Sequence, residues 1–301
     1  MTASDPTPAD LPSRGRQPAI ARTIDELRRH VGAFRTAGEY LGLVPTMGAL
    51  HAGHLALVAA SRLACDRTIV SIFVNPTQFA PHEDLAKYPR PFEEDVRLLA
   101  EAGVDVVFAP EPGEMYPPGA STTVSPPAVA GPLEGERRPT HFAGVCTVVL
   151  KLFNIVTPDA AFFGQKDYQQ ALVILRMVAD LDIPVRVVVR PTVREADGLA
   201  MSSRNRYLSD DERRRALAIS RGLTSAEGLA GAGERSAAAL EAAVTGELAD
   251  AGIVDVDYVT LRSGTTLLPL TAWEPGAVLL VACRVGTTRL IDNAVLAGPA
   301  S

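Results

Sequence analysis

Two histidines, His51 and His54, stand three positions apart at the start of a predicted helix, directly after an apolar strand and a glycine turn. Residues at i and i+3 share one face of a helix, so the two imidazoles should lie close together. The first helical turn also has unpaired N–H groups and a partial positive charge, which attract phosphate. Gly48 and Gly53 would let the backbone approach such a ligand because they have no Cβ. The segment predicts a phosphate site; a connection whose histidines only cap or pack is the alternative.

Three further polar motifs stand after other predicted strands. They are Asn75-Pro76-Thr77-Gln78-Phe79, Gly164-Gln165-Lys166-Asp167 and Met201-Ser202-Ser203-Arg204-Asn205. Taken singly, each has an ordinary interpretation as a loop or a helix start. The carboxyl ends of parallel strands meet at one edge of a sheet, however, and open α/β sheets bind ligands there. Together the motifs supply what phosphoryl chemistry needs: helix N-termini, the cations Lys166 and Arg204, and histidines that can stabilise developing charge.

Strands and helices alternate through the first two thirds of the chain, and these elements must position the motifs. Apolar, largely β-branched runs predict strands at 40–46, 68–74, 105–108, 160–164 and 185–190. Helical spacing of apolar residues predicts helices at 24–37, 54–64, 92–102, 144–156 and 168–180. Thr23 and Glu26 form a capping box before the first of these helices, which Gly38 ends. Such alternation indicates a parallel sheet that is covered on both faces.

Beyond about Val193 the pattern becomes that of a small α+β domain. Ser209 and Glu212 form a second capping box, and an Ala-rich helix is predicted over 236–250. Strands are predicted at 255–261, 278–285 and 288–295. We therefore predict a disordered tail at 1–20, an α/β domain at 21–192 and an α+β domain at 193–301.

Composition limits the possible functions. The chain has 301 residues, of which 47% are hydrophobic, and a net charge of −6, which argues against nucleic acid as the main partner. No apolar run is long enough to span a bilayer, and residues 1–20 lack the apolar stretch of a signal peptide. The three cysteines, Cys65, Cys146 and Cys283, fit neither a disulfide framework nor a zinc site. These features indicate a protein of the reducing cytoplasm with no membrane partner.

Several common motifs are absent from the sequence. It contains no P-loop, no Gly-x-Gly-x-x-Gly after a strand and no Gly-x-Ser-x-Gly nucleophile elbow. His51 and His54 have no nearby third ligand, which disfavours a transition-metal site. His30 is predicted on an exposed helix surface and His82 in a loop. His141 lies in a segment rich in glycine and proline, where a binding role and a structural role are equally compatible with the sequence.

These motifs, with Tyr88-Pro89-Arg90, Arg138-Pro139-Thr140-His141-Phe142-Ala143-Gly144-Val145 and Ala196-Asp197-Gly198-Leu199-Ala200, resemble the pantothenate synthetase family. Its members are ligases that join pantoate to β-alanine while ATP is cleaved to AMP and pyrophosphate. The resemblance extends from about Thr23 to Leu296, although the HxGH element is shared with other nucleotidyltransferases and class I aminoacyl-tRNA synthetases. It implies a Rossmann-like nucleotide-binding domain of the HxGH nucleotidyltransferase type, a smaller C-terminal domain that acts as a lid, and a homodimer.

The resemblance also implies roles for particular residues. His54, His51 and Lys166 would be catalytic, with His54 as the general acid. Gln78 and Gln170 would hold the hydroxyl and carboxylate groups of pantoate, because amides both donate and accept. Asn75 and His141 would complete the site for pantoate and β-alanine. ATP would contact Met47, Gly48, Ala49, Leu50, His51, Ala52, Gly53, His54, Gly164, Gln165, Lys166, Asp167, Val193, Met201, Ser202, Ser203 and Arg204.

Magnesium would bind chiefly through phosphate oxygens, with Asp95 as an outer contact. The chain departs from the family pattern at Gln165, where glutamate is usual, and at Ala52, where the family is variable. The implied mechanism has two steps: the pantoate carboxylate attacks the α-phosphorus of ATP, and the amine of β-alanine then attacks the pantoyl adenylate. Two other functions stay open, a nucleotidyltransferase whose product keeps the nucleotide and a catalytically inactive nucleotide-binding module. Release of AMP distinguishes the ligase from both.

Overall fold

The computed structural model describes residues 17–79, 85 and 88–296. The chain divides into two compact units, one formed by residues up to Gln165 together with Gln170–Pro191, and the other by Lys166–Gln169 together with the chain from Thr192 on. The sequence predicts a domain boundary between 192 and 193, close to this division, but it places Lys166–Gln169 in the first domain. His82 and the predicted tail as far as residue 16 lie outside the described residues.

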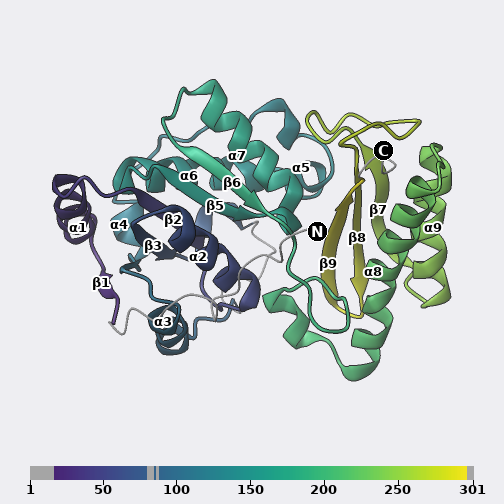
Figure 1. Ribbon diagram of the computed structural model, residues 1–301, viewed down its shortest axis with the longest axis horizontal. Coiled ribbons are helices and arrows are strands. Elements are labelled where there is room, and N and C mark those ends of the chain that lie inside the picture. Colours follow the sequence, from purple (N-terminus) through teal and green to yellow (C-terminus); the bar gives the residue numbers. More distant parts are fainter. Residues whose placement is uncertain (1–16, 80–84, 86–87, 297–301) are drawn as a thin grey trace. The chain divides into compact units, whose positions relative to one another are not determined.

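Six parallel strands form the sheet of the first unit (Figure 1), in the order β1-β4-β3-β2-β5-β6. Their bounds are Ala19–Ala21 (β1), Val106–Phe108 (β4), Arg67–Ile72 (β3), Leu41–Thr46 (β2), Ala160–Gly164 (β5) and Arg186–Arg190 (β6). From β2 the chain proceeds outward through β3 and β4, and it then resumes at β5 on the other side of β2. The order therefore reverses between β2 and β5, and open α/β sheets bind ligands beyond the carboxyl ends of strands at such a reversal.

Strand β1 begins inside the segment that the sequence predicts as a disordered tail, so that prediction is wrong for its last residues. Ala19 and Ile20 pair with Val106 and Val107 of β4. A strand of three residues has no readable periodicity of its own. Its order comes from the hydrogen bonds of the neighbouring strand, which local sequence does not reveal.

Helices cover both faces of this sheet and produce two separate cores. On one face lie α1 (Ile24–Thr36), α6 (His141–Val156) and α7 (Tyr168–Asp180), and on the other lie α2 (Ala52–Ala64) and α3 (Phe92–Glu101). Successive strand residues alternate between the two cores, as Leu43 and Val44 do. Shorter helices, α4 (Pro112–Met115) and α5 (Glu134–Arg137), lie in the connections. This arrangement confirms the predicted parallel sheet buried on both faces.

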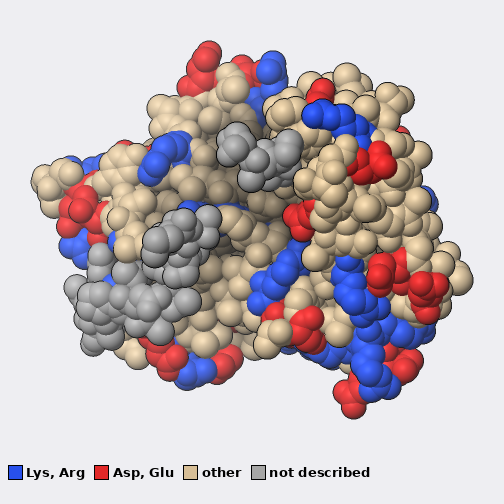
Figure 2. Space-filling model, turned by 45° about the vertical axis from the view of Figure 1, so that its right-hand side comes forward, with Lys and Arg blue, Asp and Glu red and all other residues tan. Residues whose placement is uncertain are grey.

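The second unit is built on a three-stranded antiparallel sheet. Its strands are β7 (Asp255–Arg262), β8 (Val278–Val285) and β9 (Thr288–Val295), and its helices are α8 (Asp210–Gly231) and α9 (Ala237–Asp250). The helices and the sheet enclose one apolar core. Basic and acidic side chains are interspersed over the surface of this unit seen in Figure 2. None of the helices in the described ranges combines the length and the apolar character that crossing a membrane requires.

Both predicted capping boxes are present. The Thr23 hydroxyl accepts the Glu26 N–H, and the Ser209 hydroxyl accepts that of Glu212, while each glutamate returns a bond to the backbone N–H of the capping residue. The backbone N–H groups of Arg22 and Thr23 hold the pKa of Glu26 below its ordinary value. The two boxes fix the beginnings of α1 and α8 at the predicted residues.

The three cysteines are buried and unpaired. Burial raises the pKa of Cys65 and of Cys146 to about 11 and that of Cys283 to about 12. These thiols therefore stay protonated at neutral pH, whereas a thiolate is the form that acts as a nucleophile. They are core residues of their units, which agrees with a chemistry that does not use a cysteine nucleophile.

A buried carboxylate from α3 holds the loop that follows β2. The two oxygens of Asp95 accept the backbone N–H groups of Ala49 and Leu50, each at 2.8 Å, and Asp95 is only 1% exposed. Gly48 and Ala49 both have positive φ angles, 77° and 51°. A Cβ on Gly48 would lie 2.8 Å from Asp95 Oδ2, so only glycine fits there. Two charge-assisted hydrogen bonds thus stabilise a strained turn.

Replacing Asp95 with Asn tests this contact. An amide has one acceptor oxygen, so its NH2 group would face one of the two backbone donors. We expect Asp95→Asn to lower the free energy of unfolding by about 1–3 kcal/mol, measured by urea denaturation. The matched control is Glu93→Gln, which removes an exposed charge from the same first turn of α3 and should cost less than about 0.5 kcal/mol. Equal losses in the two variants would assign the effect to the helix dipole instead.

Candidate active site

The two histidines close the start of α2 as reciprocal caps. His51 is the N-cap residue, with extended backbone angles, and its Nδ1 accepts the Gly53 N–H at 3.2 Å. His54 lies three residues on, and its Nδ1 accepts the His51 N–H at 3.3 Å. The ring centroids are 4.1 Å apart, so the structure brings the two imidazoles together as the spacing predicts.

This capping arrangement selects one tautomer for each ring. A backbone N–H can only donate, so the Nδ1 atoms of His51 and His54 must both be acceptors. In a neutral imidazole the proton is then on Nε2. The pair can therefore stabilise an anion through two neutral Nε2–H donors, and a proton on either Nδ1 would break the cap.

The sequence predicts unpaired backbone N–H groups in the first turn of α2, and this prediction is wrong for Gly53 and His54. The N–H of Gly53 donates to the His51 ring, and the N–H groups of His54 and Leu55 donate to the His51 carbonyl at 2.9 and 3.1 Å. The loop N–H groups that precede them donate to Asp95. The sequence shows that a helix begins here, but the protein's own groups already satisfy these donors. A role of the two imidazoles at a phosphate stays a prediction.

The resemblance implies that Asp95 is an outer contact of magnesium, and that role stays a prediction. Both of its oxygens accept backbone N–H groups, and its side chain is closed off from solvent. This geometry argues for a structural carboxylate that shapes the loop. Within the described ranges, no three His, Cys, Asp or Glu side chains are grouped so that they could hold a metal ion.

The predicted substrate residues Asn75 and Gln78 lie in one hydrogen-bonded turn after β3. Asn75 Nδ2 donates to Gln78 Oε1 at 3.1 Å and to the Gly144 carbonyl at 3.2 Å. The Tyr116 hydroxyl donates to Asn75 Oδ1 at 2.9 Å, and burial raises the pKa of Tyr116, so that it stays a donor at neutral pH. Gln78 Nε2 contacts the sulfur of Met47 at 3.1 Å. The turn therefore joins the loops that follow β3 and β2.

His141, at the start of α6, holds the same turn from the other side. Its Nδ1 lies 3.0 Å from the Gln78 carbonyl oxygen, which can only accept, so Nδ1 carries the proton. Its Nε2 is 3.3 Å from a guanidinium nitrogen of Arg138. A Cβ on Gly144 would lie 2.5 Å from the Thr77 carbonyl oxygen, which explains the glycine at this close contact. His141 positions Gln78, and its contact with a substrate stays a prediction.

Other predicted residues follow β5, on the opposite side of the reversal in strand order. Gly164 is the last residue of β5, Gln165 begins a 3₁₀ turn that ends at Asp167, and Gln170 lies in the first turn of α7. All but the exposed Asp167 are partly buried. Their positions at the ligand-binding edge of the sheet agree with the predicted contacts to ATP and pantoate, which stay predictions.

In the second unit, Lys166 lies in a small pocket with Ser202 and Arg204. The pocket has room for roughly one water molecule. Asn293 of β9 donates to the Lys166 carbonyl at 3.0 Å, and the Lys166 ammonium lies 3.7 Å from an Asp167 oxygen. Three of the predicted ATP residues are therefore brought together within this unit.

A short hairpin leads into the Ser202–Arg204 turn. The Met201 N–H donates to the Val193 carbonyl at 2.9 Å, and Ser202 caps the following 3₁₀ helix (Ser203–Tyr207) by accepting the Arg204 N–H at 3.3 Å. These bonds place the predicted ATP residues Val193, Met201 and Ser203 in one folded segment.

Sequence reasoning missed two residues of this pocket region, Asp292 and Asn293. Asp292 is 3% exposed in its side chain and pairs with Arg194 at 2.6 Å. Two adjacent polar residues among the apolar residues of 290–295 were the only signal that could have identified them.

Comparison with known proteins covers nearly the whole chain. A model of the family described as pantoate-beta-alanine ligase matches residues 19–295. The pantothenate synthetase of Moorella thermoacetica is 53% identical over 277 residues, covering 92% of this chain and 98% of that protein. Pantothenate synthetase 1 of Bradyrhizobium diazoefficiens is 54% identical over 278 residues, covering 92% and 98%.

Solved structures agree. The pantothenate synthetase of Thermus thermophilus superposes with a TM-score of 0.88 at 46% identity, covering 93% of this chain and 99% of that one. The pantoate-beta-alanine ligase of Francisella tularensis, solved with beta-gamma ATP and beta-alanine, gives a TM-score of 0.78 at 34% identity, covering 94% and 100%. The sequence match, the shared fold and the motifs at the carboxyl ends of the strands lead to one conclusion: the chain belongs to the pantoate–β-alanine ligase family.

Proposed function

We propose that this chain condenses pantoate with β-alanine, using ATP, to form pantothenate, AMP and pyrophosphate through a pantoyl adenylate. The observation that carries this proposal is the family match over residues 19–295. The structure supports it with candidate groups for pantoate and for ATP in the described units. The Francisella tularensis relative, with its bound ATP and β-alanine, supports the same substrates here.

In the first step the pantoate carboxylate attacks the α-phosphorus of ATP. Negative charge increases on the phosphate oxygens in that transition state, and preorganised donors stabilise it. We assign this role to His51 and His54, whose neutral Nε2–H groups are fixed by their caps. Lys166 and Arg204, of the second unit, counter the triphosphate charge.

Pantoate recognition is assigned to the turn after β3. Gln78 and Asn75 are buried, with 9% and 1% exposure, and both amides are held in place by neighbouring groups. Buried amides that donate and accept suit a ligand with hydroxyl and carboxylate groups. Gln170, in the first turn of α7, is assigned to the same substrate.

In the second step the amine of β-alanine attacks the activated carbonyl and AMP leaves. No enzyme nucleophile is required, because the mixed anhydride is already a good electrophile. The site must keep water from that anhydride. The protonated, buried cysteines agree with a route that has no covalent enzyme intermediate.

Magnesium is assigned to the phosphates of ATP. This small, hard ion usually keeps several waters and binds through substrate phosphates rather than through a cage of protein ligands. The described residues, which form no cluster of three potential ligands, fit that mode. The ion would neutralise phosphate charge when it is bound.

We also propose a homodimer in the cytoplasm. The dimer is implied by the family resemblance, and sedimentation of the purified chain tests it directly. The unpaired state of Cys65, Cys146 and Cys283 supports a reducing compartment.

Isotope exchange tests the proposed function. If pantoyl adenylate forms before the amine is needed, labelled pyrophosphate should enter ATP in the presence of pantoate and magnesium and without β-alanine. Exchange should disappear when pantoate is left out. During full turnover, a pantoate carboxylate labelled with oxygen-18 should transfer one labelled oxygen to AMP. Pantothenate production without that transfer would contradict an acyl adenylate, and a nucleotide retained on the product would favour a nucleotidyltransferase.

His54→Gln separates catalysis from capping. Glutamine at the third helical position can still accept the His51 N–H as a capping-box partner, but it lacks the imidazole. We expect kcat to fall roughly 100-fold or more, as with loss of a preorganised donor, while the melting temperature changes little. His30→Gln removes an imidazole from α1 and should leave kcat unchanged. Normal turnover in the folded His54 variant would rule out the assigned role.

Gln78→Ala tests the assignment of pantoate to the turn after β3. The change removes a buried donor and acceptor, so the pantoate KM should rise about tenfold or more, and the ATP KM far less. Met47→Leu is the matched control, because it removes the sulfur contact of Gln78 while it nearly conserves volume. If Met47→Leu raised the pantoate KM as much as Gln78→Ala does, Gln78 would serve only to join the two loops.

A further inference from the structure

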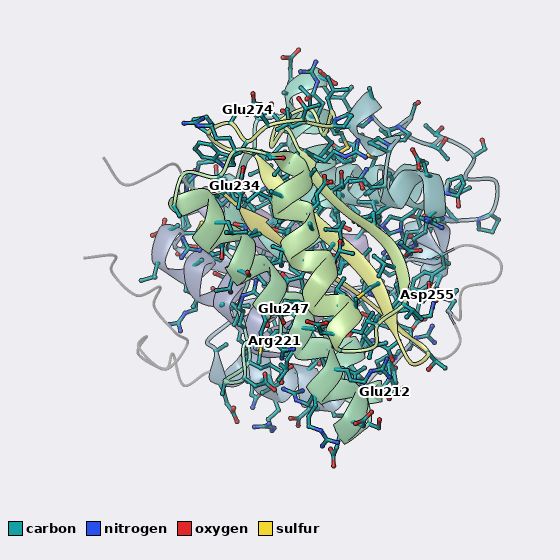
Figure 3. The ribbon with its side chains drawn as sticks, turned by 90° about the vertical axis from the view of Figure 1, so that its right-hand side faces the viewer. Glu212, Arg221, Glu234, Glu247, Asp255 and Glu274 are labelled. Atoms are coloured by element: carbon teal, nitrogen blue, oxygen red, sulfur yellow. The ribbon has the colours of Figure 1, made fainter. Side chains whose placement is uncertain are left out.

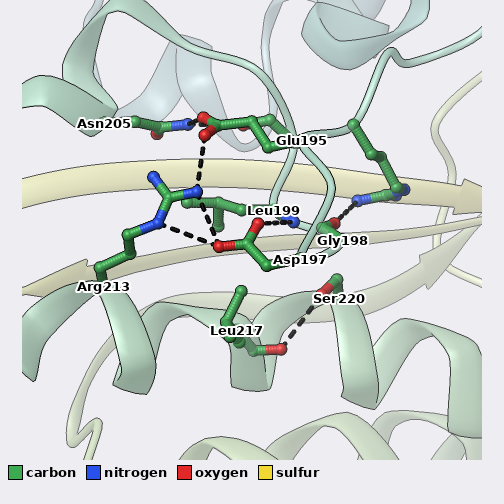
Figure 4. Close-up of polar contacts among 10 residues, drawn as sticks. Glu195, Asp197, Gly198, Leu199, Asn205, Arg213, Leu217 and Ser220 are labelled. Atoms are coloured by element: carbon green, nitrogen blue, oxygen red, sulfur yellow. Dashed lines mark hydrogen bonds and ion pairs between the residues drawn. The ribbon is translucent and has the colours of Figure 1, made fainter. Parts of the chain in front are cut away.

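Asn205 belongs to the Met201–Asn205 motif, and the assignments above give it no role. It is buried, with 7% exposure, and it lines the same pocket as Lys166, Ser202 and Arg204. Its Nδ2 donates to Glu195 Oε1 at 2.6 Å (Figure 4). It also donates to the Ala200 carbonyl at 3.0 Å. A buried amide in the wall of this pocket therefore makes two directed bonds.

These partners fix the orientation of the amide. Both are acceptors, so the nitrogen of Asn205 must face them and the oxygen must lie on the other side. Asn205 Oδ1 is buried and has no hydrogen-bond partner within the described part of the chain. An unpartnered buried acceptor is unfavourable for folding.

Glu195 is itself oriented by an arginine of α8. Arg213, from the first turns of α8, donates to Glu195 Oε2 at 2.6 Å and to Asp197 Oδ2 at 3.0 and 2.7 Å (Figure 4). The two oxygens of Glu195 are thus divided between Arg213 and Asn205. The hydrogen bonds that Arg213 donates to Glu195 and then to Asp197 raise the pKa of Arg213, which therefore keeps its charge.

Asn205 makes hydrogen bonds to the chain on either side of Met201, in the segment that is assigned to ATP. Its side chain holds the Ala200 carbonyl, just before Met201, and its backbone N–H donates to the Ser202 carbonyl at 3.1 Å. Residues between these two bonds have little freedom to move independently. The side chain and the backbone of Asn205 thus both help to fix the conformation of Ser202 and Arg204.

We propose that Asn205 is a positioning residue of the ATP site. Its amide, oriented by Glu195 and Arg213, keeps the Ser202–Arg204 turn in the conformation that binds the phosphates. This inference rests on the proposed function, because it assumes that ATP is the ligand of the turn.

Asn205→Asp gives a pH-dependent test. The new carboxylate would lie beside Glu195, where the native nitrogen–oxygen distance is 2.6 Å. Above the carboxyl pKa values the two groups repel, whereas at lower pH one shared proton restores a donor and an acceptor. The turn should be displaced at high pH and restored at low pH. Other charged groups near the substituted side chain are Asp197, Arg213, Arg194, Asp292, Lys166, Arg204 and Arg289.

At each pH, the ATP KM of the variant is divided by the ATP KM of the unsubstituted protein. For Asn205→Asp, the ratio of ATP KM values should be about tenfold or more near pH 8 and should fall toward one near pH 5.5. Calorimetry of magnesium-ATP binding should show the same trend without any turnover. The pantoate KM should change much less than the ATP KM. Arg213→Lys, which loses the planar fork, should raise the ATP KM by a smaller factor without the pH dependence.

Arg221→Ala is the matched control. Arg221 lies on α8 like Arg213, but it pairs with Glu247 of α9 at 3.0 Å, on the outer surface of the helices (Figure 3). Its loss should leave the ATP KM within about twofold. If the Asn205→Asp ratio does not change with pH, or if Arg213→Lys affects ATP binding no more than Arg221→Ala does, Asn205 is only structural. If the unsubstituted protein shows no pantoate-dependent exchange, the proposed function fails, and the calorimetric pH trend decides the role of Asn205 by itself.

Discussion

The loop that leads from β2 to His51 depends on one buried ion, the Asp95 carboxylate. It accepts the N–H groups of Ala49 and Leu50, in a turn with two consecutive positive φ angles. A buried charge is tolerated only when it is paired or hydrogen-bonded, and here each oxygen has a backbone donor. His51 follows this turn directly and begins α2. The Asp95 carboxylate thus fixes the turn from which His51 and His54 begin α2.

Local sequence patterns predict most helices and strands, because the spacing of apolar and capping residues within each element indicates its type and its bounds. The strand Ala160–Gly164 and the helix Tyr168–Asp180 have their predicted bounds, and the capping boxes at Thr23 and Ser209 are present. Hydrogen bonds between residues that are distant in the sequence could not be predicted. Asp95 lies 46 residues from the Ala49 N–H that it accepts. Without that partner, the loop N–H groups look available for a ligand.

Partners that are distant in the sequence also explain why Lys166 belongs to the second unit and not, as predicted, to the first domain. Its segment follows β5 and continues into α7, so a local pattern places it with the first domain. Its carbonyl is nevertheless held by Asn293, and the Tyr168 hydroxyl donates to the Gly264 carbonyl at 2.8 Å. These bonds fasten the Lys166 segment to the second unit, the unit that also carries Arg204. The two cations assigned to the triphosphate are therefore structurally parts of one body, although 38 positions separate them in the sequence.

The tautomers of the histidines bear on how the first chemical step is catalysed. With Nδ1 of His51 and of His54 occupied as acceptors, each neutral ring has its proton on Nε2. Adding a second proton would place an N–H against a backbone N–H and open the start of α2. General acid catalysis by His54, which the family resemblance implies, would require that ring to exchange its Nε2 proton. Pyrophosphate is an adequate leaving group as an anion and does not need such a proton. The geometry therefore favours neutral hydrogen-bond donation to the phosphate, so that these histidines act by preorganised electrostatics.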